Sequence, residues 1–337
     1  MRRRTKHALR LALTLGTLAL LVVLARRVDW PAVLRAARGA DLRLLAAAVA
    51  VNFLGLVSKA LSWWVFLRPV GAGSPGIAIR ASFVGSGLNN VLPANGGDAA
   101  RVVFVTRTAG IPAPTALATI ALERIFDLVG YVLFLGVAPL LIPLPEMVAR
   151  WRWIALGLLA PLVGFLWFLT RRGVHHRASG NVLTHVAGEA VPDSQWARVR
   201  HHAARFSRSV SALATGPRFF SAALLALGFW ASQVATFGLV ARAAGLGLPL
   251  AGHVATTLAV NVSFLLRPTP GNVGFFQLVY AVTAGAFGVP RATAIAVALL
   301  IQTLQIVPTT LVGIALAPEF VFRRAKRVPT DGDLAAQ

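Results

Sequence analysis

The sequence predicts an all-α polytopic membrane protein, and three observations lead to this prediction. The chain has 337 residues, of which 57% are hydrophobic and only 13% charged, whereas soluble domains carry about 25% charged residues. The apolar residues gather in long runs, and about 20 of them suffice for a helix to cross a bilayer. Glycines, prolines and amides interrupt two of these runs, and such residues end helices. We expect about six full transmembrane helices and two re-entrant or broken helical hairpins.

Composition also excludes several classes of protein. The chain has no cysteine, which rules out disulfides and thiolate metal sites. Its net charge of +22 would suggest nucleic-acid binding in a soluble protein. Here the basic residues flank apolar runs, where they orient spans and contact anionic headgroups. The histidines lack the spacing of metal ligands. We therefore expect membrane lipids as partners, and no nucleic acid, metal or cofactor.

Four full spans are predicted in the first half of the chain: 8–25, 44–67, 113–137 and 151–169. A short interfacial helix is predicted between the first two spans, in 28–43. Lys59 lies inside the second span, close to Trp63 and Trp64. We interpret Lys59 as a side chain that snorkels to the membrane surface.

The first interrupted run begins after a turn near Gly76. Residues 77–92 are apolar but cover only about 24 Å at 1.5 Å per residue, which is too short to cross the membrane. Pro93 ends this run, and a second short piece follows from Ala99 to Thr108. Backbone that leaves the helix inside a membrane must line a polar cavity or be buried in protein. This stretch therefore predicts the first hairpin.

The second half repeats this arrangement. Full spans are predicted at 219–241 and 291–317, and between them the short runs 251–266 and 275–287 flank a Pro/Gly-rich break. Each hairpin is followed by a similar turn, Gly110-Ile111-Pro112 in the first half and Gly288-Val289-Pro290 in the second. The similarity predicts an internal repeat.

Basic residues predict the topology. They cluster at the N-terminus, in 171–218 and in 323–327, so these three regions are expected on the cytoplasmic side of the plasma membrane. The first hairpin then enters from the cytoplasm and the second from outside, which is the inverted repeat of many transporters. We expect one membrane domain over 1–320, whose halves 1–170 and 219–320 flank the basic loop 171–218, and a polar tail over 321–337.

The first break carries the strongest candidate site. Gly96 and Gly97 allow close approach of the backbone, and Asp98 is a natural N-cap for a helix that starts at Ala99. A helix N-terminus and Arg101 could together bind an anionic phosphate. The simpler alternative is that Asp98 only caps the helix and pairs with Arg101 three residues later.

A charge cluster follows in the third span. Glu123 and Asp127 share one helix face, and Arg124 lies beside them. Paired carboxylates are found in hydrolases, but a buried ion-pair network is the better explanation. At the second break, Arg267 could contact phosphate with Asn261 and Asn272 as amide partners. We expect Gln302 and Gln305, on the last span, to hydrogen-bond across to neighbouring helices.

The candidate lipid-phosphate site thus combines the two breaks and the charge cluster: Asn90, Pro93, Gly96, Gly97, Asp98, Arg101, Glu123, Arg124, Asp127, Arg267, Gly271, Asn272 and Gly274. No catalytic residue is assigned, because no nucleotide-binding loop or catalytic triad order is present.

These motifs resemble the lysylphosphatidylglycerol synthase transmembrane family. The resemblance rests on Asn90, Leu92-Pro93, Gly96-Gly97-Asp98 and Arg101, on Glu123-Arg124 with Asp127, and on Pro270-Gly271 with Gly274. It covers most of 8–320 and implies a flippase-like integral membrane protein. The two-part synthases also carry a soluble aminoacyl transfer domain after the membrane domain, for which we expect no room before Gln337.

Three functions remain open at this stage. The favoured one is a flippase or transporter that moves a phospholipid or a polyprenyl-phosphate-linked lipid. The alternatives are a membrane-embedded lipid-modifying transferase and a non-catalytic membrane partner of a separate lipid-modifying enzyme. The sequence does not decide between a homo-oligomer and a complex with a soluble transferase, nor whether the chain is an enzyme.

Overall fold

The computed structural model describes residues 31, 34, 38–91, 96–141, 146, 153, 157, 161, 164, 216–266 and 272–316. Within these residues every regular element is helical: α3 (Leu42–Leu67), the 3-10 turn η1 (Arg68–Val70), α4 (Pro75–Val91), α5 (Gly96–Ala109), α6 (Ala113–Leu141), α11 (Gly216–Ala243), α12 (Leu250–Leu266), α13 (Phe275–Gly285) and α14 (Arg291–Ala315). The predicted span 8–25, most of 151–169, nearly all of the loop 171–218 and the tail lie outside the described residues.

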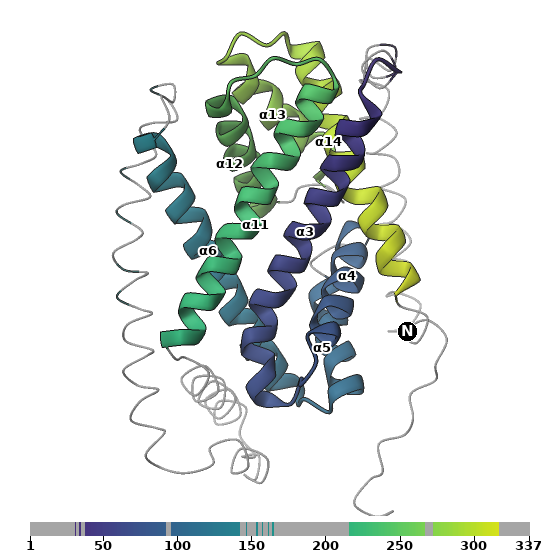
Figure 1. Ribbon diagram of the computed structural model, residues 1–337, viewed down its shortest axis with the longest axis vertical. Helices are drawn as coiled ribbons and strands as arrows, with labels where there is room; N and C mark the ends of the chain where they lie inside the picture. Colours follow the sequence, from purple (N-terminus) through teal and green to yellow (C-terminus); the bar gives the residue numbers. More distant parts are fainter. Residues whose placement is uncertain are drawn as a thin grey trace, which may run out of the picture.

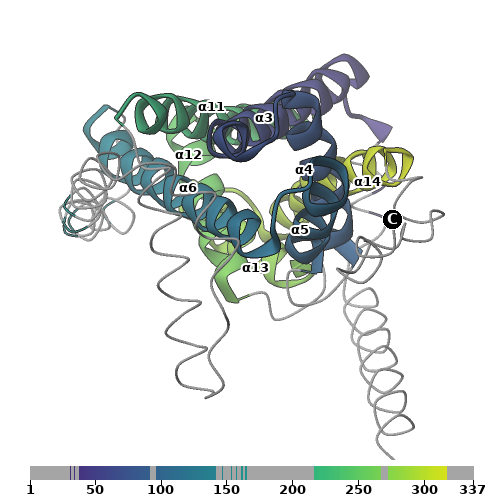
Figure 2. The same cartoon turned by 90° about the horizontal axis from the view of Figure 1, so that it is seen from below.

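Three of the described segments are long and apolar enough to cross a membrane: Leu42–Val70, Pro217–Ala243 and Arg291–Ala315. Helix α6 also has 29 residues, but it contains three charged side chains. The helices α3 and α11 lie side by side along the molecule, with α6 and α5 across from them (Figures 1 and 2). At one end Asp41 caps α3 by accepting a hydrogen bond from Arg43 N at 2.8 Å.

The two pairs of short helices are present as predicted from the breaks. Helices α4 and α5 have 17 and 14 residues, and α12 and α13 have 17 and 11. Each pair packs together, and the pairs occupy opposite halves of the long axis (Figure 1). The turns Gly110-Ile111-Pro112 and Gly288-Val289-Pro290 both contain a glycine with positive φ, +67° at Gly110 and +79° at Gly288. Glycine adopts this left-handed region without strain.

Glycines allow the first hairpin to pack closely. A Cβ atom on Gly97 would lie 1.9 Å from the carbonyl oxygen of Gly85, so α4 and α5 approach to backbone contact here. On its other side α4 meets α14, where a Cβ on Gly313 would lie 2.6 Å from the Phe83 carbonyl oxygen. Small residues at helix interfaces permit such contacts within membranes. Helix α4 of the first hairpin is therefore fixed between α5 and the last span.

Apolar side chains form a separate core for each hairpin. One cluster joins α3, α4, α5 and α6 around the fully buried Trp63. Another joins α11, α12, α13 and α14 around Tyr280 and Phe237. The charged site described next borders the first of these clusters.

Candidate functional site

Six charged side chains from three helices form a closed ring of alternating sign. Helix α3 contributes one cation, α5 an anion and a cation, and α6 two anions and a cation. Each member pairs with two neighbours within 4.0 Å, in the order Lys59, Glu123, Arg101, Asp98, Arg124, Asp127 and back to Lys59. With three cations and three anions the ring has no net charge. This neutrality offsets the cost of placing charges among apolar helices.

The distances between paired charged groups differ around the ring. Arg101 pairs tightly with Glu123, and Lys59 with Asp127. Arg124 Nη2 lies 2.6 Å from Asp98 Oδ2. Looser contacts close the circle: Arg124 to Asp127 at 3.5 Å, Arg101 to Asp98 at 3.5 Å and Lys59 to Glu123 at 3.9 Å. Every carboxylate thus faces two cations, so each can exchange its main partner without losing all compensation.

Burial divides the ring into two edges. The side chains of Arg101 and Glu123 are only 5% and 1% exposed, and they form the buried edge. The side chains of Arg124 and Asp98 are 42% and 22% exposed, and they form the open edge. A ligand can reach the ring only where its charges are accessible. The open edge is therefore the place where an anion could enter.

The packing around Arg101 explains how the buried edge forms. Its guanidinium lies 4.0 Å from the centre of the Trp63 ring, and cations are attracted to that aromatic face. A Cβ on Gly85 would lie 2.5 Å from Arg101 Cγ, so the glycine makes room for the arginine stem. Among the described residues Arg101 Nε has no hydrogen-bond partner, which is unusual for a buried donor.

Helix α5 begins differently from the prediction. It starts at Gly96, so Asp98 lies in its first turn and does not cap a helix that starts at Ala99. The backbone N–H of Gly97 donates to Asn89 Oδ1 at 2.8 Å. Asn89 thereby satisfies one of the free amides that could otherwise bind a phosphate. Asp98 is still favoured near a helix N-terminus, but its side chain is held by Arg124.

The second break contains amides instead of charges in the described residues. Asn272 is buried, has φ +60°, and donates to Ser263 Oγ at 2.8 Å. The Gly274 N–H donates to Gln277 Oε1 at 2.6 Å, and Gln277 Nε2 donates to Gln302 Oε1 at 2.5 Å. This amide cluster joins the break to α13 and α14. Farther along α14, Gln305 donates to Gln233 of α11 at 2.8 Å, so both glutamines of the last span connect helices.

The structure brings together only part of the predicted site. Five predicted residues meet in the ring: Asp98, Arg101, Glu123, Arg124 and Asp127. Gly96 and Gly97 start the helix that carries two of them, and Asn90 donates to Thr310 of α14 at 3.1 Å. Asn272 and Gly274 belong to the amide cluster in the other half. Pro93, Arg267 and Gly271 lie outside the described residues, and Asn261 donates to Thr257 O within its own helix.

Lys59 is the ring member that the sequence interpretation missed. Its Nζ contacts Asp127 and Glu123 and lies 4.8 Å from the centre of the Phe229 ring of α11, so it does not extend to the membrane surface. The sequence signal that could have identified Lys59 as a ring member was its distance from the end of the span. Lys59 is eight residues from the end of α3 at Leu67, about 12 Å along the helix. That depth, together with unpaired carboxylates elsewhere in the chain, predicts an internal partner.

Comparisons with known proteins place these features in a context. The chain is 26% identical to the glycosyltransferase AglD of Haloferax volcanii, over 93% of its own length and 54% of that protein. It thus spans about half the length of this relative. No solved structure matches the chain. The family model described as the lysylphosphatidylglycerol synthase TM region matches residues 8–313, nearly the whole chain. The protein therefore belongs to the lysylphosphatidylglycerol synthase transmembrane family.

Proposed function

We propose that this membrane protein moves an anionic, phosphate-bearing lipid, either a phospholipid or a polyprenyl-phosphate-linked lipid, from one leaflet to the other. The observation that carries the proposal is the neutral charge ring with one buried and one open edge. Ionisable side chains inside membrane helices are costly and commonly mark a substrate path. A purely structural ion pair would need neither six members nor an accessible edge.

The first step of the proposal is an exchange of partners at the open edge. A lipid phosphate binds Arg124 with charge-assisted hydrogen bonds, which arginine can form in pairs. It displaces Asp98, whose Oδ1 already lies 3.5 Å from Arg101 Nη1. Asp98 then shifts toward Arg101, while Arg124 keeps Asp127 at 3.5 Å. No charge loses every partner during this exchange, so the barrier to opening the ring remains low.

The hairpins supply the second part of the proposal. The pairs α4–α5 and α12–α13 lie in opposite halves of the molecule (Figure 1), and their helices are shorter than the roughly 20 residues of a full span. We assign them as re-entrant elements that enter from opposite sides, as in inverted-repeat transporters. The ring and the amide cluster then provide polar groups at two successive points of one path.

Reconstitution tests this function directly. The full chain is placed in phosphatidylcholine vesicles that contain trace phosphatidylglycerol labelled on its headgroup, and dithionite bleaching reports how fast label leaves the inner leaflet. We expect faster movement of labelled phosphatidylglycerol than in protein-free vesicles, and a smaller effect on labelled phosphatidylcholine. A parallel assay uses a short-chain polyprenyl phosphate. Rates equal to those of empty vesicles for both anionic lipids would refute the proposal.

The comparison with a glycosyltransferase favours one alternative, a membrane-embedded transferase that acts on a lipid-linked donor. Under this alternative the ring would hold the donor phosphate while a sugar is transferred. Incubation of purified protein with a polyprenyl-phosphate-linked sugar and an acceptor tests it by mass spectrometry of the products. A glycosylated acceptor would favour the transferase, whereas lipid movement without any product would favour the transporter.

A further inference from the structure

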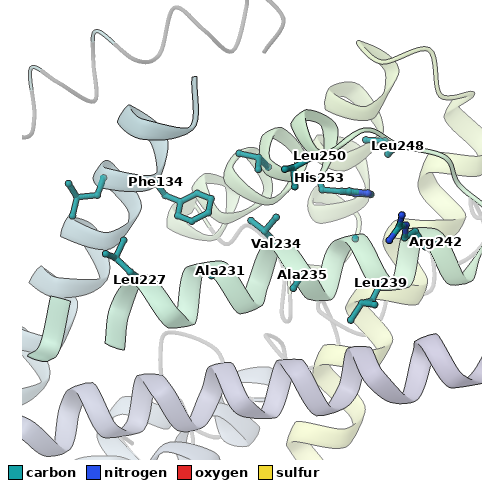
Figure 3. A pocket seen from close by; sticks show the side chains of 13 residues that line it. Phe134, Leu227, Ala231, Val234, Ala235, Leu239, Arg242, Leu248, Leu250 and His253 are labelled. Atoms are coloured by element: carbon teal, nitrogen blue, oxygen red, sulfur yellow. The ribbon is translucent and has the colours of Figure 1, made fainter. Parts of the chain in front are cut away.

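An apolar cavity of about 860 Å³ lies between α6, α11 and α12, and none of the six ring residues lines it. Its walls are mostly aliphatic or aromatic, and include Leu227, Val234 and Phe134. Two nitrogen-bearing side chains, Arg242 and His253, lie together at one end (Figure 3). Among its described lining residues there is no carboxylate. The cavity thus has a long apolar part and a basic end.

The cavity is long enough to span the hydrocarbon part of one leaflet. Leu227 and Arg242 both line it from α11, and 15 residues of helix cover about 22 Å. Half of the hydrocarbon core measures about 15 Å. Helix α11 ends at Ala243, directly after Arg242, so this arginine lies at the depth of the lipid headgroups. An acyl chain that extends from that depth would run along the apolar walls.

The basic end has no acidic partner among the described residues. Arg242 is exposed and pairs with no carboxylate among the described residues. His253 is 7% exposed, and its Nδ1 has no hydrogen-bond partner in the described part of the chain. Buried polar atoms are normally satisfied. An exposed cation beside a buried imidazole, whose Nδ1 is left without a partner by the described residues, is complementary to an anionic headgroup.

We propose that this cavity, named the groove from here on, binds one acyl chain of an anionic phospholipid whose phosphate contacts Arg242, beside His253. This lipid site extends the proposed function, and the role of the groove in transport rests on that function. Phe229, against which Lys59 lies at 4.8 Å, precedes Arg242 by 13 residues of α11, about 20 Å along the helix axis. The ring and the groove headgroup site therefore lie at different depths. The groove holds the lipid in the leaflet opposite to that from which it reaches the ring.

Lipid retention tests the headgroup contact. The full chain is purified in mild detergent, mixed with phosphatidylglycerol or phosphatidylcholine, and analysed by native mass spectrometry. Arg242→Gln should lower retention of phosphatidylglycerol about fivefold, the size expected for one basic side chain at an anionic lipid, and lower that of zwitterionic phosphatidylcholine less. Arg291→Gln removes an exposed arginine from the start of α14 and should change neither lipid. Equal effects of the two variants would overturn the proposal.

Site-specific labelling tests the position of the chain. Because the protein has no cysteine, Ala235→Cys provides a single thiol in the exposed wall of the groove. Phosphatidylglycerol should slow maleimide labelling there, but not at Leu224→Cys, which is 60% exposed on the same helix and does not line the groove. If protection of the Ala235→Cys thiol from maleimide rises with protein concentration in the absence of lipid, a second copy of the protein occupies the groove. That result would overturn the proposal.

The same variants separate this inference from the proposed function. Suppose that phosphatidylglycerol protects Ala235→Cys from labelling and that its retention depends on Arg242, but that no lipid moves in vesicles. The assignment of the groove as a lipid site is then supported, and the transport function fails. If lipid moves normally while Arg242→Gln changes neither retention nor rate, the groove assignment fails and the transport function stands.

Discussion

The guanidinium of Arg101 lies 4.0 Å from the centre of the Trp63 ring, so a buried cation of α5 stacks on an aromatic side chain of α3. Both residues also reach α6: Arg101 pairs with Glu123, and the Trp63 indole donates to Thr119 Oγ1 at 3.0 Å. A desolvated cation–π contact contributes about 2 kcal/mol. These contacts hold the buried edge of the ring in place, whereas the open edge has no comparable support.

Glu123→Gln should strongly destabilise the protein. The carboxylate is buried between Arg101 and Lys59, and removal of one partner from a buried pair costs about 3–5 kcal/mol. Unfolding in detergent, followed by circular dichroism, measures this loss. The double variant Glu123→Gln with Arg101→Met should recover part of it, because no uncompensated guanidinium remains. A loss below about 1 kcal/mol in the single variant would mean that the pair is solvated.

Arg124→Gln should leave the fold almost unchanged. This side chain is 42% exposed, and accessible ion pairs contribute about 0–1 kcal/mol. Under the same conditions, the unfolding midpoint of Arg124→Gln should lie close to that of Arg80→Gln. This control removes an exposed arginine of α4 outside the ring. A loss as large as that of Glu123→Gln would show that the two edges do not differ.

Gly97→Ala should disrupt the first hairpin. The new methyl group would lie 1.9 Å from the Gly85 carbonyl oxygen and 2.7 Å from the Asn89 side chain, and overpacking of this kind costs about 1–3 kcal/mol. Thermal unfolding in detergent measures the change. Gly73→Ala is the matched control, since a Cβ there meets nothing within 4 Å. Equal stability of the two variants would contradict the close contact of α4 and α5.

Gln277→Leu should loosen the second break. Its amide accepts from Gly274 N and donates to Gln302, so the substitution leaves a backbone donor and a buried amide without these partners. Unsatisfied buried groups cost about 1–3 kcal/mol each. Hydrogen exchange should become faster at the start of α13, whereas α4 and α5 should keep their protection. Unchanged exchange at Gly274 would show that the glutamine does not fix this turn.

Sequence patterns predicted the local structure well, because local signals determine it. Prolines and glycines located both breaks, and the four-residue spacing placed Glu123 and Asp127 on one face, where both contact Lys59. Helix ends shifted by a few residues, as at α6, which continues to Leu141 instead of ending at 137. The i,i+3 contact of Asp98 with Arg101 was the simpler alternative to a phosphate site, and the closer partner of Asp98, Arg124, was not predicted.

Long-range contacts could not be predicted in the same way. The ring depends on α3 lying against α6, and no spacing within either segment specifies which lysine meets which carboxylate. Lys59 was therefore interpreted as a surface residue. The sequence likewise combined both breaks into one site, although the described residues of the second break form a separate amide cluster with Ser263 and Gln302. Two similar motifs show similar local structure, but they do not show that their side chains meet.

The exchange of partners at the open edge is tested most directly by the rate of phosphatidylglycerol movement in vesicles containing Arg124→Gln or Arg80→Gln. Both variants lose one exposed positive charge and should stay folded, but only Arg124 pairs with Asp98. We expect Arg124→Gln to lower the rate at least about tenfold, as loss of one charge-assisted phosphate contact of about 1.5–3 kcal/mol requires, while Arg80→Gln keeps the wild-type rate. Equal rates for the two folded variants would contradict the account.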